Sequence, residues 1–157
     1  MEILAGSMGM NWPVAGVARR GIAMLEDYLA PVLDLAIRIW VAKVFFMSGL
    51  TKIQSWDTTL SLFENEYNVP LLPPELAAYM GTAAELVLPV FLVLGLGGRL
   101  FAAALFVFNI IAVLSYPDLG EVGLKDHQYW GLLLLVTLLH GPGKLSVDHL
   151  IRRRFFN

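Results

Sequence analysis

The stretch LAAYMGTAAELVLPVFLVLGLGGRLFAAALFVFNIIAVLSY, residues 76–116, decides the fold of this chain. It contains two apolar runs, residues 76–96 and 100–116, and each approaches the ~20 residues that a helix needs to cross a bilayer. The connection between the runs is short and rich in glycine, which makes the two helices an antiparallel pair. The sequence shows no strands of alternating polarity, so these runs are predicted to be transmembrane helices.

Two further apolar runs flank this pair, at residues 31–53 and 128–139. The last run is the shortest, and it spans a bilayer only if its polar neighbours lie in the interface. Between the first and second runs, the outer loop carries aromatic residues and is expected to hold a short helix that caps the bundle. The predicted fold class is therefore all-α, a four-transmembrane-helix bundle.

The chain divides into three predicted parts. They are an N-terminal cytoplasmic or interfacial arm at residues 1–30, the transmembrane domain at residues 31–140, and a basic amphipathic cytoplasmic tail at residues 141–157. Residues 12–29 of the arm fit either an interfacial helix or a loosely ordered segment. The tail carries three consecutive arginines beside apolar residues, and it is expected to lie on the anionic membrane face or simply to stop transfer.

Composition supports a membrane protein. Hydrophobic residues make up 57% of the chain and charged residues 15%, whereas soluble domains have roughly 45–50% and about 25%. The mean hydropathy is +0.67, so the apolar surplus is expected to face a lipid bilayer. The net charge of −2 gives no basic field for a nucleic acid. The sequence has no cysteine, which excludes disulfides and thiolate-bound zinc or iron–sulfur clusters.

The distribution of lysine and arginine predicts the orientation. Seven of the 11 cations fall on one side of the predicted membrane: Arg19, Arg20, Arg99, Lys144, Arg152, Arg153 and Arg154. Lys52 and Lys125 fall on the other side, and Arg38 and Lys43 lie within the first run. By the positive-inside rule, the chain is expected to be a multi-pass membrane protein with both termini in the cytoplasm.

Polar residues inside the runs are the candidate binding or ion-pair residues, because each buried charge costs roughly 2.5–3.5 kcal/mol on insertion scales. Arg38 and Lys52 share one helical stripe. The stripe faces a bundle cavity or an anionic ligand; alternatively, the two long side chains snorkel to the two interfaces. Lys43 points away from this stripe and is expected to have a partner on another helix. Asn109 is expected to form an interhelical hydrogen bond, with a ligand contact as the alternative.

Glu85 lies near the middle of the second run, four residues before Pro89. One interpretation is a carboxyl that binds a ligand or handles protons in a dry pocket. The other is a structural ion pair with the first run. Depth favours Lys43 as the partner and the polar stripe favours Arg38, and we expect Arg38.

No metal site is predicted. None of the three histidines, His127, His140 and His149, lies in the middle of an apolar run, and no paired His or Glu motif for zinc or di-iron occurs. Motifs for nucleotide binding or serine hydrolysis are also missing from the sequence. Catalytic residues are therefore unknown at this stage, and whether the protein is an enzyme stays open.

Three groups of residues together resemble the DoxX family of small bacterial four-helix membrane proteins. They are Arg38 with Phe46-x-x-Gly49-x-x-Lys52, Glu85 with Gly95-x-Gly97-x-Arg99, and the stretch from Gly141 to Asp148. The resemblance covers residues 38–148 and leaves the N-terminal arm outside. It implies that Arg38, Lys52 and Glu85 occupy family positions, without giving them catalytic roles. It also implies proximity to redox enzymes, since the family takes its name from a subunit linked to a thiosulfate- or quinol-oxidising complex.

Two functions of different classes follow. The first is an accessory or quinone-associated subunit of a membrane redox system, in which Arg38, Glu85 and Asn109 line one apolar pocket. This function needs a redox-enzyme partner, because the sequence shows no electron carrier, and it allows a bound quinone without any covalent cofactor. The second is a non-catalytic membrane scaffold or a small-molecule permeation unit. Assembly into a homo-oligomer is compatible with both.

Overall fold

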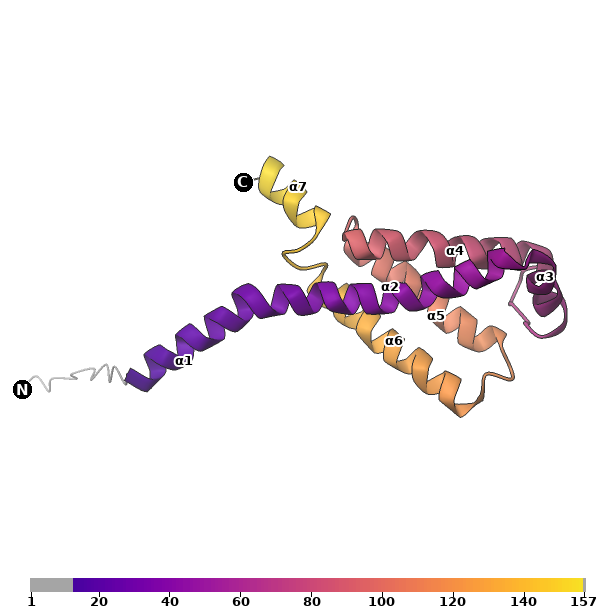
Figure 1. The fold of residues 1–157 in the computed structure, drawn as a ribbon, viewed down its shortest axis with the longest axis horizontal. Helices are drawn as coiled ribbons and strands as arrows, with labels where there is room; N and C mark the ends of the chain where they lie inside the picture. Colours follow the sequence, from indigo (N-terminus) through magenta and orange to yellow (C-terminus); the bar gives the residue numbers. More distant parts are fainter. Residues whose placement is uncertain (1–12, 157) are drawn as a thin grey trace, which may run out of the picture.

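The computed structural model describes residues 13–156, with side chains from residue 16 onward, and this part of the chain is helical without any strand. Figure 1 shows the helices in chain order. They are α1 (Pro13–Met24), the π-helical turn η1 (Leu25–Leu29), α2 (Ala30–Gln54), α3 (Trp56–Asn65), α4 (Pro74–Leu94), α5 (Gly98–Ser115), α6 (Gly120–His140) and α7 (Val147–Phe155).

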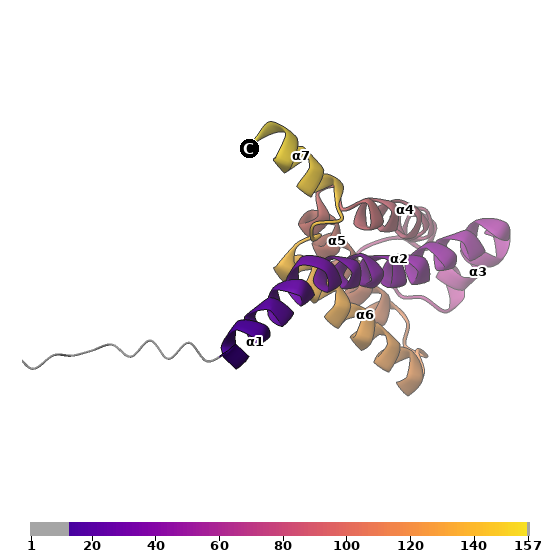
Figure 2. The ribbon, with the colours of Figure 1, turned by 60° about the vertical axis from the view of Figure 1, so that its left-hand side comes forward.

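Four long helices, α2, α4, α5 and α6, form the bundle and alternate in direction. Helix α2 packs on α4, α4 on α5, and α5 on α6. We call the end with the α4–α5 turn and residues 141–146 the turn end, and the end with α3 and residues 116–119 the loop end. Both α1 and α7 lie at the turn end, and α6 diverges from α2 toward the loop end (Figures 1 and 2).

The centre of the bundle is aliphatic and aromatic. Leu92, Leu105 and Leu134 are fully buried, one each from α4, α5 and α6. Phe45 of α2 packs edge-on against Phe108 and Trp130, with ring centroids 6.1 and 5.9 Å apart. This core joins all four long helices, as expected for a helix bundle.

Two bundle helices, α4 and α5, are long and apolar enough to cross a membrane. Only 33% of the apolar window of α4 and 28% of that of α5 are buried inside the protein, so most of their apolar surface faces outward, where lipid can cover it. Helices α2 and α6 are as long but carry more polar and charged residues. The all-helical class is thus confirmed, while membrane crossing by α2 and α6 stays a prediction.

The N-terminal arm is helical from Pro13 and runs into α2 without a break, extending away from the bundle (Figure 1). A π-helical turn marks the junction, where the Ala30 N–H donates to the Leu25 carbonyl. Pro31 explains it, because proline has no N–H and its ring would press on the carbonyl of residue 27 in a regular α-helix. The structure therefore favours the helical alternative for the arm, although Trp12 lies outside the described residues.

Helix α3 is the short capping helix expected in the outer loop. It lies against the first turns of α4, where Trp56 packs on Tyr79 with ring centroids 4.6 Å apart. A Cβ added at Gly81 would lie 3.5 Å from the ring of Phe63. The small residues of α4 thus let α3 cover the part of α4 that extends beyond α2.

Candidate functional site

Arg38 lies at the turn end and is completely buried, with 0% exposure. Its Nη1 donates to the carbonyls of Leu92 (3.2 Å) and Val93 (2.6 Å), and its Nη2 donates to the carbonyl of Leu145. The first two carbonyls belong to the last turn of α4, where backbone acceptors lack partners within the helix. The guanidinium thus closes the end of α4 and attaches residues 141–146 to the bundle. Arg38 does not pair with Glu85, so that prediction is wrong.

The segment from Gly141 to Asp148 folds back onto the α4–α5 turn. The two carboxylate oxygens of Asp148 accept from the backbone N–H groups of Gly97 (2.8 Å) and Gly98 (2.9 Å) at the start of α5. The Asp148 N–H donates in return to the Gly95 carbonyl at 3.1 Å. Gly95 and Gly97 have φ of 65° and 59°, a left-handed conformation that favours glycine. These residues, which belong to the groups that resemble the DoxX family, therefore hold the C-terminal segment against the α4–α5 turn.

Glu85 faces the inside of the bundle, with 7% exposure. Its carboxylate accepts from Lys52 Nζ at 2.6 and 2.8 Å and from Ser48 Oγ at 3.1 Å. Lys52 also donates to Ser48 Oγ at 2.9 Å. The structure thus contains an ion pair between the first two bundle helices, but the cation is Lys52 rather than Arg38 or Lys43.

The helix ends explain this error. Gly49 of α2 lies opposite Glu85, since a Cβ at Gly49 would be 3.0 Å from the Glu85 Cβ. Helix α4 begins eleven residues before Glu85, whereas α2 ends five residues after Gly49. Helix α4 therefore extends about 9 Å further at the loop end, at 1.5 Å per residue. Aligning the ends of the two apolar runs placed Lys43 and Arg38 too near Glu85.

Lys43 is exposed on α2 and makes no hydrogen bond or ion pair with residues 16–156. The partner expected for it on another helix is not found in this part of the chain. It borders an apolar groove of about 530 Å³ between α2 and α4. The other groove residues are Ile39, Ala42, Phe46, Pro89, Val90, Val93 and Leu94.

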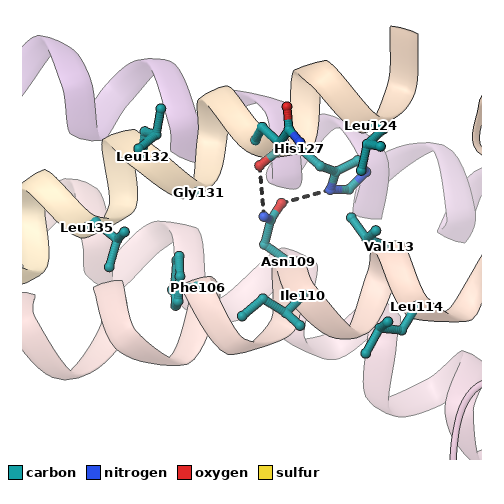
Figure 3. A pocket seen from close by; sticks show the side chains of 11 residues that line it. Phe106, Asn109, Ile110, Val113, Leu114, Leu124, His127, Gly131, Leu132 and Leu135 are labelled. Atoms are coloured by element: carbon teal, nitrogen blue, oxygen red, sulfur yellow. Dashed lines mark hydrogen bonds between the residues drawn. The ribbon is translucent and has the colours of Figure 1, made fainter. Parts of the chain in front are cut away.

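Asn109 joins α5 to α6 through His127, as Figure 3 shows. Asn109 is 4% exposed, its Nδ2 donates to the His127 carbonyl at 2.9 Å, and its Oδ1 lies 2.7 Å from His127 Nδ1. The predicted interhelical hydrogen bond is therefore confirmed. Because an amide oxygen only accepts, His127 Nδ1 carries a proton, and in the neutral ring Nε2 is then an acceptor.

The Asn109–His127 pair forms one wall of a pocket between α5 and α6, with a volume of about 460 Å³ (Figure 3). Gly131 lets the helices approach here, because a Cβ at this position would lie 3.4 Å from Asn109 Nδ2. The His127 ring also packs on Trp130, with centroids 4.7 Å apart. The remaining lining is mostly apolar: Phe106, Ile110, Val113, Leu114, Leu124, Leu132 and Leu135, with Gln128.

The five candidate residues therefore do not form one pocket, contrary to the expectation for Arg38, Glu85 and Asn109. Lys52 and Glu85 meet, Asn109 meets His127, and Arg38 and Lys43 lie elsewhere. Sequence reasoning missed His127 because the apolar run begins after it. The signal was its spacing of four residues from Gly131, which puts both residues on the same face of a helix.

Comparison with known proteins identifies a family. The DoxX family model matches residues 33–117, from α2 to the end of α5. An uncharacterized protein of Haemophilus influenzae is 31% identical over 127 residues, which is 76% of this chain and 83% of that protein. No solved structure matches. The family match includes Arg38, Lys52, Glu85 and Asn109 but ends before His127 and the segment from Gly141. This chain belongs to the DoxX family.

Proposed function

We propose that this DoxX-family membrane protein is a quinone-associated accessory subunit of a membrane redox system, with the quinone in the α5–α6 pocket. The observation that carries the proposal is the Asn109–His127 pair on the wall of a mostly apolar pocket. It replaces the pocket of Arg38, Glu85 and Asn109 expected from the sequence.

The pocket suits a quinone in size and in lining. Its volume of about 460 Å³ falls within the roughly 300–1,000 Å³ of small-molecule sites, which are mostly apolar with a few placed polar groups. The Asn109 amide uses one of its two N–H groups on the His127 carbonyl, so the second can donate to a quinone carbonyl. His127 Nε2 has no partner within residues 16–156, and it can accept from a quinol hydroxyl.

The bound group would supply the redox chemistry, since a quinone takes up two electrons and two protons when it is reduced. Asn109 would orient the ring, and His127 would hold a hydroxyl proton at Nε2. The aliphatic lining would exclude water from the ring and contact the hydrocarbon tail. Electrons would come from a redox-enzyme partner.

Quinone binding can be measured with the purified protein in nanodiscs and a short-chain ubiquinone as the probe. We expect Asn109→Leu and His127→Phe each to weaken binding at least tenfold. Ser115→Ala is the matched control, because within residues 16–156 the Ser115 hydroxyl bonds only to the Ile111 carbonyl of its own helix. Equal affinity of wild type and both pocket variants would refute the proposed site.

We also propose that α2, α4, α5 and α6 all span the bacterial cytoplasmic membrane, with both termini in the cytoplasm. Support comes from the turn end, which gathers α1, α7 and the α4–α5 turn, and with them most cations outside the bundle. Alkaline phosphatase, which needs the periplasm, should be active when fused after Glu66 or Asp118 and inactive after Asn157. The opposite pattern would reverse the orientation.

A non-catalytic scaffold is the alternative function. The observation that favours it is that Arg38, Lys52 and Glu85 all find partners within the chain. A permeation unit, the other form of this alternative, has no such support. If the folded protein binds no quinone while Asn109→Leu loses stability, the Asn109–His127 pair serves only to join two helices, and the scaffold is correct.

A further inference from the structure

Lys43 lies close to the turn end of the bundle. Gly49 faces Glu85 across α2 and α4, and the two helices run in opposite directions, so Lys43 is level with Phe91. Phe91 lies four residues before Gly95, the C-cap of α4, which is about 6 Å at 1.5 Å per residue. Side chains of a helix tilt toward its N-terminus, and α2 begins at the turn end (Figure 1). The lysine stem therefore carries its ammonium group toward the interface at this end.

An exposed tryptophan marks the same level. Trp40 precedes Lys43 by three residues and is 64% exposed, and tryptophan is enriched where membrane and water meet. Lys43 makes no hydrogen bond or ion pair with residues 16–156. Asp34, the acid of α2, lies nine residues away, on the opposite face of the helix beside Gly143. The Lys43 ammonium is thus available to an anion at the interface.

The apolar groove between α2 and α4 runs along both helices. Its lining residues are Ile39, Ala42, Lys43 and Phe46 on α2 and Pro89, Val90, Val93 and Leu94 on α4. The α2 residues extend over two turns, or about 10 Å from the turn end toward the middle of the bundle. Ala42 and Pro89 are buried and form the floor. Ile39, Val90 and Leu94 are exposed along the rims. The groove, of about 530 Å³, therefore has the direction that an acyl chain takes in a bilayer.

We propose that this groove binds an anionic phospholipid of the leaflet at the turn end, with the phosphate on Lys43 and one acyl chain between α2 and α4. This inference rests on the proposed topology, which places the turn end at the cytoplasmic leaflet, where anionic lipids attract basic groups. A zwitterionic lipid brings its own cation to its phosphate, so Lys43 favours a headgroup without one. Among residues 16–156, no carboxylate lines the groove and repels the phosphate.

A second copy of the chain fits the groove less well than a lipid. A two-fold contact through the groove would bring two Lys43 ammonium groups together, because the same surface of each copy takes part in such a contact. A phospholipid instead supplies the opposite charge at the level of the interface and an apolar chain below it.

The test uses phosphatidylglycerol with a photoreactive group in one acyl chain, as a minor component of phosphatidylcholine nanodiscs that hold the full-length protein. Cross-linked residues are identified by peptide mass spectrometry, and phosphatidylcholine with the same photoreactive chain is the comparison. We expect phosphatidylglycerol to label the groove residues of α2 and α4 at least fivefold more than phosphatidylcholine. Equal labelling by both lipids would overturn the proposal.

Substitutions of Lys43 test whether its charge selects the lipid. Lys43→Met should reduce labelling of the groove by phosphatidylglycerol to the phosphatidylcholine level, and Lys43→Arg should preserve it. Lys125→Met is the matched control, because it removes an exposed lysine at the loop end, away from the groove, and should leave the labelling unchanged. Labelling unaffected by Lys43→Met, or reduced equally by Lys125→Met, would overturn the proposal.

Matched tryptophan variants test whether the acyl chain enters the groove. Val90 on α4 and Val107 on α5 are both exposed, but only Val90 borders the groove. Val90→Trp should abolish labelling of the groove and Val107→Trp should not; equal effects would overturn the proposal. Displacement of the lipid by short-chain ubiquinone would assign the groove to the quinone instead. The chain has no cysteine, so a disulfide-linked dimer in high yield from an oxidised Val90→Cys variant would assign it to a second copy.

Failure of this proposal is separable from failure of the earlier ones. Lys43 does not line the α5–α6 pocket, so Lys43→Met should leave the quinone affinity of the purified chain unchanged. The reporters after Glu66 and Asn157 test independently which leaflet the turn end faces. A chain with the proposed topology and normal quinone affinity, but without a preference for phosphatidylglycerol in the groove, would overturn only the lipid site.

Discussion

The turn end and the loop end satisfy their buried polar side chains in different ways. At the turn end, Arg38 and Asp148 bond to backbone groups: three carbonyls accept from Arg38, and two N–H groups donate to Asp148. At the loop end, Lys52 bonds to Glu85 and His127 to Asn109, mostly through side chains. The backbone partners are held by the ends of α4 and α5 and by the 141–146 segment, so they cannot rotate as side chains can. We call this set of hydrogen bonds at the turn end the lock. Side-chain partners can rotate, so the loop end is where a ligand can be accommodated.

Arg38→Met gives the largest expected effect and would break the lock. It removes the guanidinium donor from the carbonyls of Leu92, Val93 and Leu145 in a buried site, and of these only Leu92 keeps a backbone donor, the Gly95 N–H, among the described residues. We expect a loss of roughly 3–5 kcal/mol in unfolding free energy, because each buried acceptor that loses its donor costs about 1–3 kcal/mol. Thermal and denaturant unfolding of the detergent-solubilised protein measure it.

Arg38→Lys separates the contribution of the charge from that of the hydrogen bonds. Lysine keeps the charge but lacks the planar fork that reaches three carbonyls, so it should recover only part of the stability. Arg99 is the control at the same end, because it is exposed and makes one long bond of 3.3 Å to the His140 carbonyl. If Arg38→Met were no more destabilising than Arg99→Met, the lock would not depend on Arg38.

Glu85→Gln tests the ion pair of the loop end, with a smaller expected loss of about 2–3 kcal/mol. The reduction relative to Arg38 has a physical reason: the Lys52 side chain is 15% exposed and can reach water when its partner is lost. Lys52→Met combined with Glu85→Gln completes a double-mutant cycle, which should give a coupling energy of about 1–3 kcal/mol. Additive effects of the two substitutions would show that the pair contributes no stability.

Gly98→Ala should destabilise by about 1–3 kcal/mol through overpacking. A Cβ at this position would lie 2.5 Å from the Pro142 Cβ, so the 141–146 segment would have to move. Gly21→Ala is the matched control: it lies in helix α1, where an added Cβ meets nothing within 4 Å. Alanine there should stabilise the helix by about 0.5–1 kcal/mol. Equal effects at both positions would mean that the segment is not held tightly against α5.

The contrast between the ends also shows what the sequence predicts. The apolar runs correctly predicted the long helices. The cost of burying the Glu85 carboxylate correctly predicted that a cation on α2 would pair with it. Which cation pairs with Glu85 depends on how far α4 extends beyond α2 at the loop end. That extension depends on the packing of α3, which no local sequence pattern encodes. The hydrogen bonds of the turn end could not be predicted from the sequence either, because Asp148 reaches Gly97 and Gly98 only after the chain reverses at residues 141–146. His127 was missed because its helix begins in a polar stretch.

Asp148 gives the smallest expected effect and separates two interpretations of the C-terminal segment. If the segment only stops transfer, removing its carboxylate should change nothing. In the structure, however, both carboxylate oxygens accept from N–H groups at the start of α5, which have no acceptor within that helix. Asp148→Ala should therefore cost about 1 kcal/mol, the usual value for losing an N-cap. Asp148→Asn keeps one acceptor oxygen and should cost less, while the exposed Asp57 mutated to Ala on α3 should cost less than either. Unfolding free energies of the three variants in one detergent give the comparison, and identical values for Asp148→Ala and Asp57→Ala would contradict the capping role.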